Sequence, residues 1–122
     1  MIDSVAGYWA RPSDADESVL DYLWIGENGR IVHRINYQHG PFVMILWADF
    51  VEGDTFEVKL KPKSNAHRVI LRREGSGLRM EHLDLMNPAT DFTGIKEDEI
   101  PDLFVADLKW AAKNMDKLEK KA

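Results

Sequence analysis

The sequence predicts a mainly β protein of the α+β class. We expect an antiparallel up-and-down β-meander of about seven strands, forming a barrel or half-barrel, with one C-terminal helix. Short segments rich in β-branched and aromatic residues follow one another through residues 1–86, with turn-forming residues between them. From residue 98 the apolar residues recur at helical spacing instead. Strands followed by a helix, without alternation, exclude a doubly wound parallel sheet.

Length and composition indicate one soluble domain. The 122 residues are 44% hydrophobic and 30% charged, and we assign them to a single domain with the meander over 1–86 and the helix over 98–120. The net charge of −5 argues against a nucleic-acid partner. No apolar run reaches the ~20 residues of a membrane helix, and the N-terminus lacks a signal-peptide pattern. We therefore expect a cytoplasmic protein without a membrane partner.

The first third of the chain contains three expected strands. One surrounds Trp9 and ends before Pro12. Residues 18–25 are apolar on both phases, so a helix competes with a strand there. The following Asn-Gly turn favours a strand that enters a hairpin, because this dipeptide adopts positive φ angles. Residues 30–37 then alternate in polarity and form the third strand.

The middle of the chain predicts a central hairpin. Residues 42–50 are almost wholly apolar, which is typical of a strand buried on both faces. Turn residues follow, and residues 56–60 alternate apolar with charged side chains. Residues 62–65 supply the next turn.

Two more strands are expected before the sheet ends at Asn87-Pro88. They cover residues 67–74 and 78–85, with a glycine-rich turn between them. Leu83 and Leu85 fall on the opposite phase from Leu78 and Met80, which predicts a β-bulge near His82.

A helix is predicted from about residue 101 to residue 120. Its N-cap is assigned to Asp98, and lysines gather in the last turn, where the helix dipole favours them. It is expected to cover one side or one open end of the sheet. The apolar residues at helical spacing are Ile100, Phe104, Leu108, Ala111, Met115 and Leu118.

Two histidines lie on otherwise apolar strand faces. A polar group on such a face needs a hydrogen-bond partner or a wet cavity. In the simpler interpretation, each histidine is structural and hydrogen-bonded within the fold. In the functional interpretation, both histidine side chains point into one cavity. His33 shares its face with Ile31, Ile35 and Tyr37, and His82 shares its face with Leu78 and Met80.

The leading functional hypothesis is non-catalytic binding of a small, mainly apolar ligand in a cavity between sheet and helix. Three polar residues are expected to orient the ligand: His33, Tyr37 and His82. Apolar contact is expected from Trp24, Met44, Trp47 and Met80.

No motif for catalysis, metal binding or cofactor binding is present. The chain lacks cysteine, a Gly-x-Ser-x-Gly elbow, a phosphate loop and the histidine pairs of metal sites. We therefore predict no metal and no cofactor, and we favour a binding protein over an enzyme. A small hydrolase or isomerase that uses a histidine and a carboxylate is the least favoured hypothesis.

Strands that are apolar on both phases support a different alternative, a protein-interaction module or homodimer without a ligand pocket. Tyr22 beside Leu23, and Trp47 beside Leu46, place apolar side chains on both faces of the sheet. One face forms the core and the other needs cover. Either the helix or a second subunit supplies that cover.

The tripeptide Gly7-Tyr8-Trp9, at the start of a meander that ends in a helix, resembles the lipocalin and fatty-acid-binding group of small barrels. The resemblance implies a lumen for a small apolar molecule. Thr90-Asp91-Phe92 looks like a second lipocalin signature. It follows the last expected strand instead of lying in mid-barrel, so no role is transferred to it.

Overall fold

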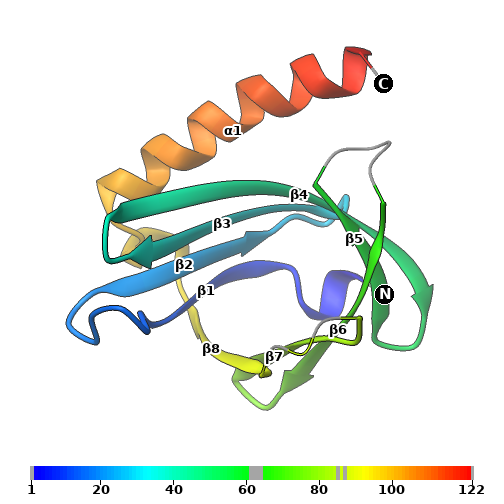
Figure 1. The fold of residues 1–122 in the computed structure, drawn as a ribbon, viewed down its shortest axis with the longest axis horizontal. Helices are drawn as coiled ribbons and strands as arrows, with labels where there is room; N and C mark the ends of the chain where they lie inside the picture. The colour runs from blue at the N-terminus through cyan, green and yellow to red at the C-terminus, as the bar shows by residue number, and fades with distance from the viewer. Residues whose placement is uncertain (1, 61–64, 85, 87, 122) are drawn as a thin grey trace.

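The computed structural model describes residues 2–60, 65–84, 86 and 88–121. It is a closed barrel of eight antiparallel strands with one long helix packed on the outside (Figure 1). The elements, in chain order, are η1 (Ile2–Ser4), β1 (Gly7–Pro12), β2 (Leu20–Ile25), β3 (Arg30–Tyr37), β4 (Gly40–Glu52), β5 (Thr55–Lys59), β6 (His67–Glu74), β7 (Gly77–His82), β8 (Thr90–Ile95), η2 (Glu97–Glu99) and α1 (Asp102–Lys121).

The predicted fold class is confirmed, and the structure adds one strand to it. Each strand pairs with the next along the chain, and β8 pairs back with β1 to close the barrel. The expected meander stopped at residue 86 and lacked β8. This strand escapes pattern analysis because Phe92 and Ile95 are its large apolar residues and they do not alternate.

The geometry of closure explains why β8 is needed. A closed meander in which every neighbour is antiparallel requires an even number of strands, because strand direction alternates around the ring. Phe92 points inward and is buried. At Gly94 an added Cβ atom would lie 3.4 Å from the Trp9 ring and 3.3 Å from the Ser76 carbonyl oxygen. Glycine therefore lets β8 approach β1 closely.

The irregularity in the sheet is not at the predicted position. Strand β7 ends at His82 in regular register with its neighbours, and Leu83 lies beyond it. The register shift in the described pairings falls between Phe50 and Glu52, opposite β5. Of the remaining expectations, Leu85 and turn positions 62–64 lie outside the described residues.

Two apolar cores explain the strands that are apolar on both phases. Leu23 and Leu46 face the barrel interior, whereas Tyr22 and Trp47 face α1. Figure 1 shows α1 lying along the outside of β3 and β4. The helix thus covers one side of the sheet and not an open end, which were the two predicted arrangements.

Apolar packing and ion pairs fix α1 in this position. Phe104 is fully buried and stacks on Tyr22 with ring centroids 5.4 Å apart. Arg34 Nη1 donates a hydrogen bond to Asp107 Oδ2 at 2.8 Å. Near the end of the helix, Glu119 pairs with Arg30 and accepts a hydrogen bond from Trp47 Nε1 at 3.1 Å. The helix therefore braces the barrel wall and does not cap its opening.

Apolar side chains gather at one end of the barrel interior. Val5, Trp9 and Phe56 lie at the end where β1 begins and β2 finishes, and Ile2 packs against them. Trp9 Nε1 donates a hydrogen bond to the Val5 carbonyl oxygen at 2.9 Å, which ties the segment before β1 into this cluster. A hollow of about 350 Å³ lies at this end, beside Ile2 and Phe56, and a cavity of about 540 Å³ lies toward the opposite end.

Candidate functional site

A cavity of about 540 Å³ occupies the opposite end of the barrel interior. Strand ends and the β1–β2 and β3–β4 connections form its rim, while Met80 and Phe92 separate it from the apolar core below. Its wall is mainly apolar. The residues that line it include Arg11, Asp21, His33, Ile35, Met44, Leu46, Met80, His82 and Phe92.

Both predicted histidines lie in this wall, on strands β3 and β7. His33 Nε2 and His82 Nδ1 are the two buried side-chain polar atoms without a hydrogen-bond partner in the part of the chain that the structure describes. The His33 ring contacts Phe92 edge-on, with centroids 5.8 Å apart. A buried polar atom without a partner costs about 1–3 kcal/mol. The site therefore carries unmet hydrogen-bonding capacity.

Both imidazoles are neutral near pH 7. Burial lowers the pKa of His33 to about 4, and the nearby Arg11 cation and His82 act in the same direction. Burial also lowers the pKa of His82, with a contribution from His67. A neutral imidazole has one N–H donor and one nitrogen acceptor. The pair therefore offers the cavity both kinds of hydrogen-bonding atom without adding charge.

A charged cluster forms the rim beside the histidines. The Asp21 side chain is almost fully buried, and its Oδ1 accepts hydrogen bonds from Asn36 N at 2.8 Å and Asn36 Nδ2 at 3.1 Å. Arg11 Nη1 lies 3.9 Å from Asp21 Oδ2. Ser13 Oγ donates a hydrogen bond to the Asn36 carbonyl oxygen at 3.0 Å. These contacts join β1, β2 and β3 at the mouth of the cavity.

Sequence reasoning missed Arg11 and Asp21, although the signal that found His33 was present for both. Asp21 shares a strand phase with Leu23 and Ile25, and Arg11 shares one with Trp9. Each is a charged residue on an otherwise apolar face. The same rule that selects a histidine on such a face selects these two residues.

The structure separates the seven predicted ligand-binding residues into two groups. Five of them line the cavity in the lumen: His33, Tyr37, Met44, Met80 and His82. Trp24 and Trp47 face α1 on the outer surface of the barrel instead. They have the opposite strand phase from the lumen residues Leu23 and Leu46, so they cannot share a cavity with the histidines.

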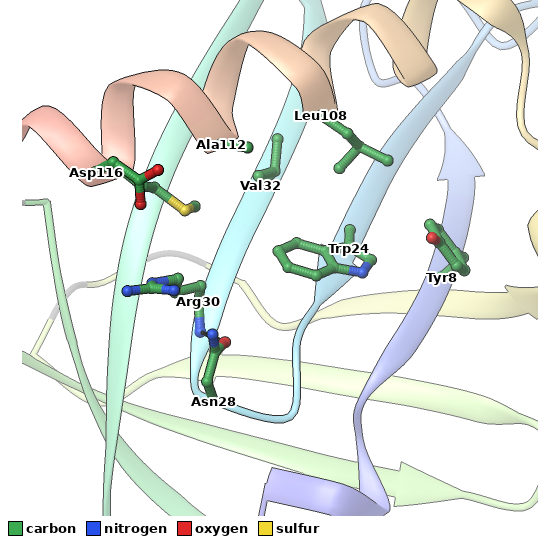
Figure 2. Close-up of a pocket in the computed structure, with 9 residues that line it drawn as sticks. Tyr8, Trp24, Asn28, Arg30, Val32, Leu108, Ala112 and Asp116 are labelled. Atoms are coloured by element: carbon green, nitrogen blue, oxygen red, sulfur yellow. Dashed lines mark hydrogen bonds between the residues drawn. The ribbon is translucent and has the colours of Figure 1, made fainter.

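Another hollow, of about 310 Å³, lies between α1 and the outer face of the barrel. Figure 2 shows Trp24 between Tyr8 and Arg30, with Leu108 and Asp116 on the helix above. Among the described side chains that line it, none carries a buried polar atom without a partner. We interpret this hollow as the seam along which the helix packs, and the lumen as the candidate site.

Neither a metal centre nor a known relative identifies the protein. In the described ranges no group of three or more His, Asp or Glu side chains is arranged to hold a metal ion. Within the described residues, no helix is both long and apolar enough to cross a membrane. Comparison of the chain with family models, curated proteins and solved structures finds no match. Function must therefore be inferred from the chemistry of the site.

Proposed function

We propose that the protein binds a small, mainly apolar molecule in the lumen of its barrel and performs no chemistry on it. The observation that carries this proposal is an apolar cavity whose wall includes His33 and His82, two side chains that each have a buried nitrogen without a hydrogen-bond partner. A volume of about 540 Å³ falls within the ~300–1,000 Å³ typical of small-molecule sites.

The unmet hydrogen bonds favour an occupied cavity over a purely structural one. A protein that buries polar atoms normally pairs them, because each unpaired atom weakens the fold. A ligand with one polar group would satisfy His33 and His82 while its apolar part contacts Met44 and Met80. The resemblance of Gly7-Tyr8-Trp9 to the lipocalin and fatty-acid-binding group points in the same direction, since such barrels hold apolar molecules.

Catalysis has weaker support. The buried carboxylate of Asp21 is occupied by Asn36, and no described carboxylate accepts a hydrogen bond from His33 or His82. A histidine that acts as a general base normally needs a third group to orient it. Among the described side chains of the cavity, no carboxylate is hydrogen-bonded to a histidine, and this favours binding over acid–base catalysis.

The homodimer hypothesis was based on an apolar sheet face expected to lack cover. Tyr22 and Trp47, which suggested an uncovered apolar face, are covered by α1 of the same chain. The outward positions of the strands away from the helix carry polar and charged residues such as Glu57, Arg72 and Arg79. Apolar side chains nevertheless remain exposed on β4 at Phe42, Phe50 and Val51, and the homodimer stays a separate prediction.

The substitution His33→Phe should abolish ligand binding without unfolding the protein. The phenyl ring fits an apolar wall but removes both hydrogen-bonding atoms and fills part of the cavity. Binding of 1-decanol, measured by isothermal titration calorimetry, is expected to weaken by at least about tenfold, which corresponds to ~1.4 kcal/mol. Far-UV circular dichroism of the variant should match that of the wild type.

His39→Phe is the matched control. His39 is exposed in the turn between β3 and β4 and does not line the cavity, so this variant should bind 1-decanol as the wild type does. Equal affinity of the wild type and a folded His33→Phe variant would contradict the proposed role of His33. Equal loss in both variants would indicate a nonspecific effect of the added phenyl group.

A further inference from the structure

The polar groups of the lumen restrict which ligand it accepts, and this inference rests on the proposed function. Arg11 is the one cation among the described residues that line the cavity, and it is already paired. Its Nη2 atom lies 3.0 Å from Asp14 Oδ1, and its Nη1 atom lies 3.4 Å from Asp14 Oδ2. Asp21 lies on its other side, 3.9 Å away. The guanidinium therefore already has carboxylate partners with which a ligand anion must compete.

The balance of charge also opposes an anion. The described lining residues comprise one guanidinium, Arg11, and two carboxylates, Asp14 and Asp21, so the formal charge is negative. The whole chain carries a net charge of −5. A ligand carboxylate would lose its hydration in the cavity without gaining a free cation in return.

A cationic ligand is not favoured either. Asp21 Oδ1 already accepts two hydrogen bonds from Asn36, and Oδ2 faces Arg11. The Asp14 side chain is 85% exposed and pairs with the same arginine. An ammonium group would find no unpaired carboxylate, and it only donates hydrogen bonds.

The unpaired groups match a neutral ligand instead. His33 and His82 line the cavity from strands β3 and β7, one nitrogen of each has no hydrogen-bond partner, and each neutral imidazole has one donor and one acceptor. A hydroxyl or a primary amide also donates and accepts. We propose that the lumen selects neutral apolar molecules that carry one hydroxyl or amide group, held between His33 and His82, and discriminates against fatty-acid carboxylates and alkylamines of equal length.

Four probes with the same alkyl chain test this selectivity: 1-decanol, decanamide, decanoate and decylamine, each titrated at pH 7.5. The readout is the dissociation constant obtained from the ¹³C-methyl signals of Met44 and Met80, which line the cavity. We expect 1-decanol and decanamide to bind at least about tenfold more tightly than the two charged probes, because an uncompensated buried charge costs more than a paired hydroxyl.

The possible outcomes separate this inference from the proposed function. Decanoate or decylamine binding as tightly as 1-decanol at the Met44 and Met80 signals would overturn the selectivity but leave lumen binding intact. Absence of binding by all four probes would overturn both proposals.

Asp14→Asn tests the cause of the discrimination. The substitution lies at an exposed loop position and removes the main partner of Arg11, so it should leave a cation available to a ligand. The affinity for decanoate should then rise several-fold relative to that for 1-decanol, in line with the modest strength of exposed ion pairs. An unchanged ratio would show that the pairing of Arg11 does not exclude anions.

Discussion

Phe104→Ala should lower the free energy of unfolding by about 3–5 kcal/mol. Phe104 is 0% exposed, stacks on Tyr22 and forms the centre of the core between α1 and the barrel wall. Removing the ring leaves a cavity that the rigid sheet cannot collapse to fill. Urea denaturation followed by circular dichroism measures the loss.

Leu103→Ala is the matched control for this prediction. Leu103 is the preceding residue of the same helix but is 48% exposed, so its truncation should cost less than about 1 kcal/mol. Similar losses for the two variants would contradict the orientation of α1 described here. Together the two variants test which face of the helix packs against the barrel.

The stability of the protein should fall as the pH drops from 7.5 to 4.5, and His33 should account for about 2–3 kcal/mol of the fall. In the unfolded chain His33 titrates near its ordinary pKa of 6.5, whereas burial lowers the folded pKa to about 4. Between these values the unfolded state binds the proton and the folded state does not. The stabilising contribution is therefore complete above 6.5 and is lost as the pH falls toward 4.

The groups that face His33 reinforce this direction. Arg11 from β1 and His82 from β7 both disfavour a proton on His33, and Phe92 from β8 gives it an apolar contact. Asp21 from β2 lines the same cavity, but it is occupied by Asn36 and Arg11.

Comparison of two variants isolates the contribution of His33. Urea denaturation at pH 7.5 and pH 4.5 should show a smaller difference for His33→Phe than for the wild type, by about 2–3 kcal/mol. His39→Phe, altered in an exposed turn, should retain the wild-type difference. If all three proteins lose the same stability between the two pH values, burial does not hold His33 neutral.

The sequence predicted the class of fold because its main determinants are local. Alternating polarity defined the strands, helical spacing defined α1, and segments apolar on both phases indicated strands covered on both sides. Strand β8 leaves a weak local signal because it carries few apolar residues, and its pairing with β1, which lies far away in sequence, forms only when the barrel closes. Strand pairing over such a long sequence separation leaves little pattern of apolar residues in the local sequence.

The candidate site was predicted in part for a related reason. Alternation shows that His33 and Tyr37 share a face of β3, but not which face becomes the lumen. In strands that are apolar on both phases, barrel closure and the position of α1 determine which face lines the lumen. For this reason Trp24 and Trp47 were grouped with the histidines although they lie under the helix. Arg11 and Asp21 also lie on apolar strand faces, so their alternation pattern is the signal that predicts them.

The methyl signals of the methionines test lumen binding most directly. Met44 and Met80 line the cavity in the barrel, Met115 lines the hollow beneath α1, and Met86 is fully exposed. A ¹³C-methyl-methionine NMR spectrum recorded with and without 1-decanol therefore reports separately on each location. Binding in the lumen predicts that Met44 and Met80 shift while Met115 and Met86 stay in place. A shift of Met115 with Met44 and Met80 unchanged would place the ligand under the helix and contradict the proposed function.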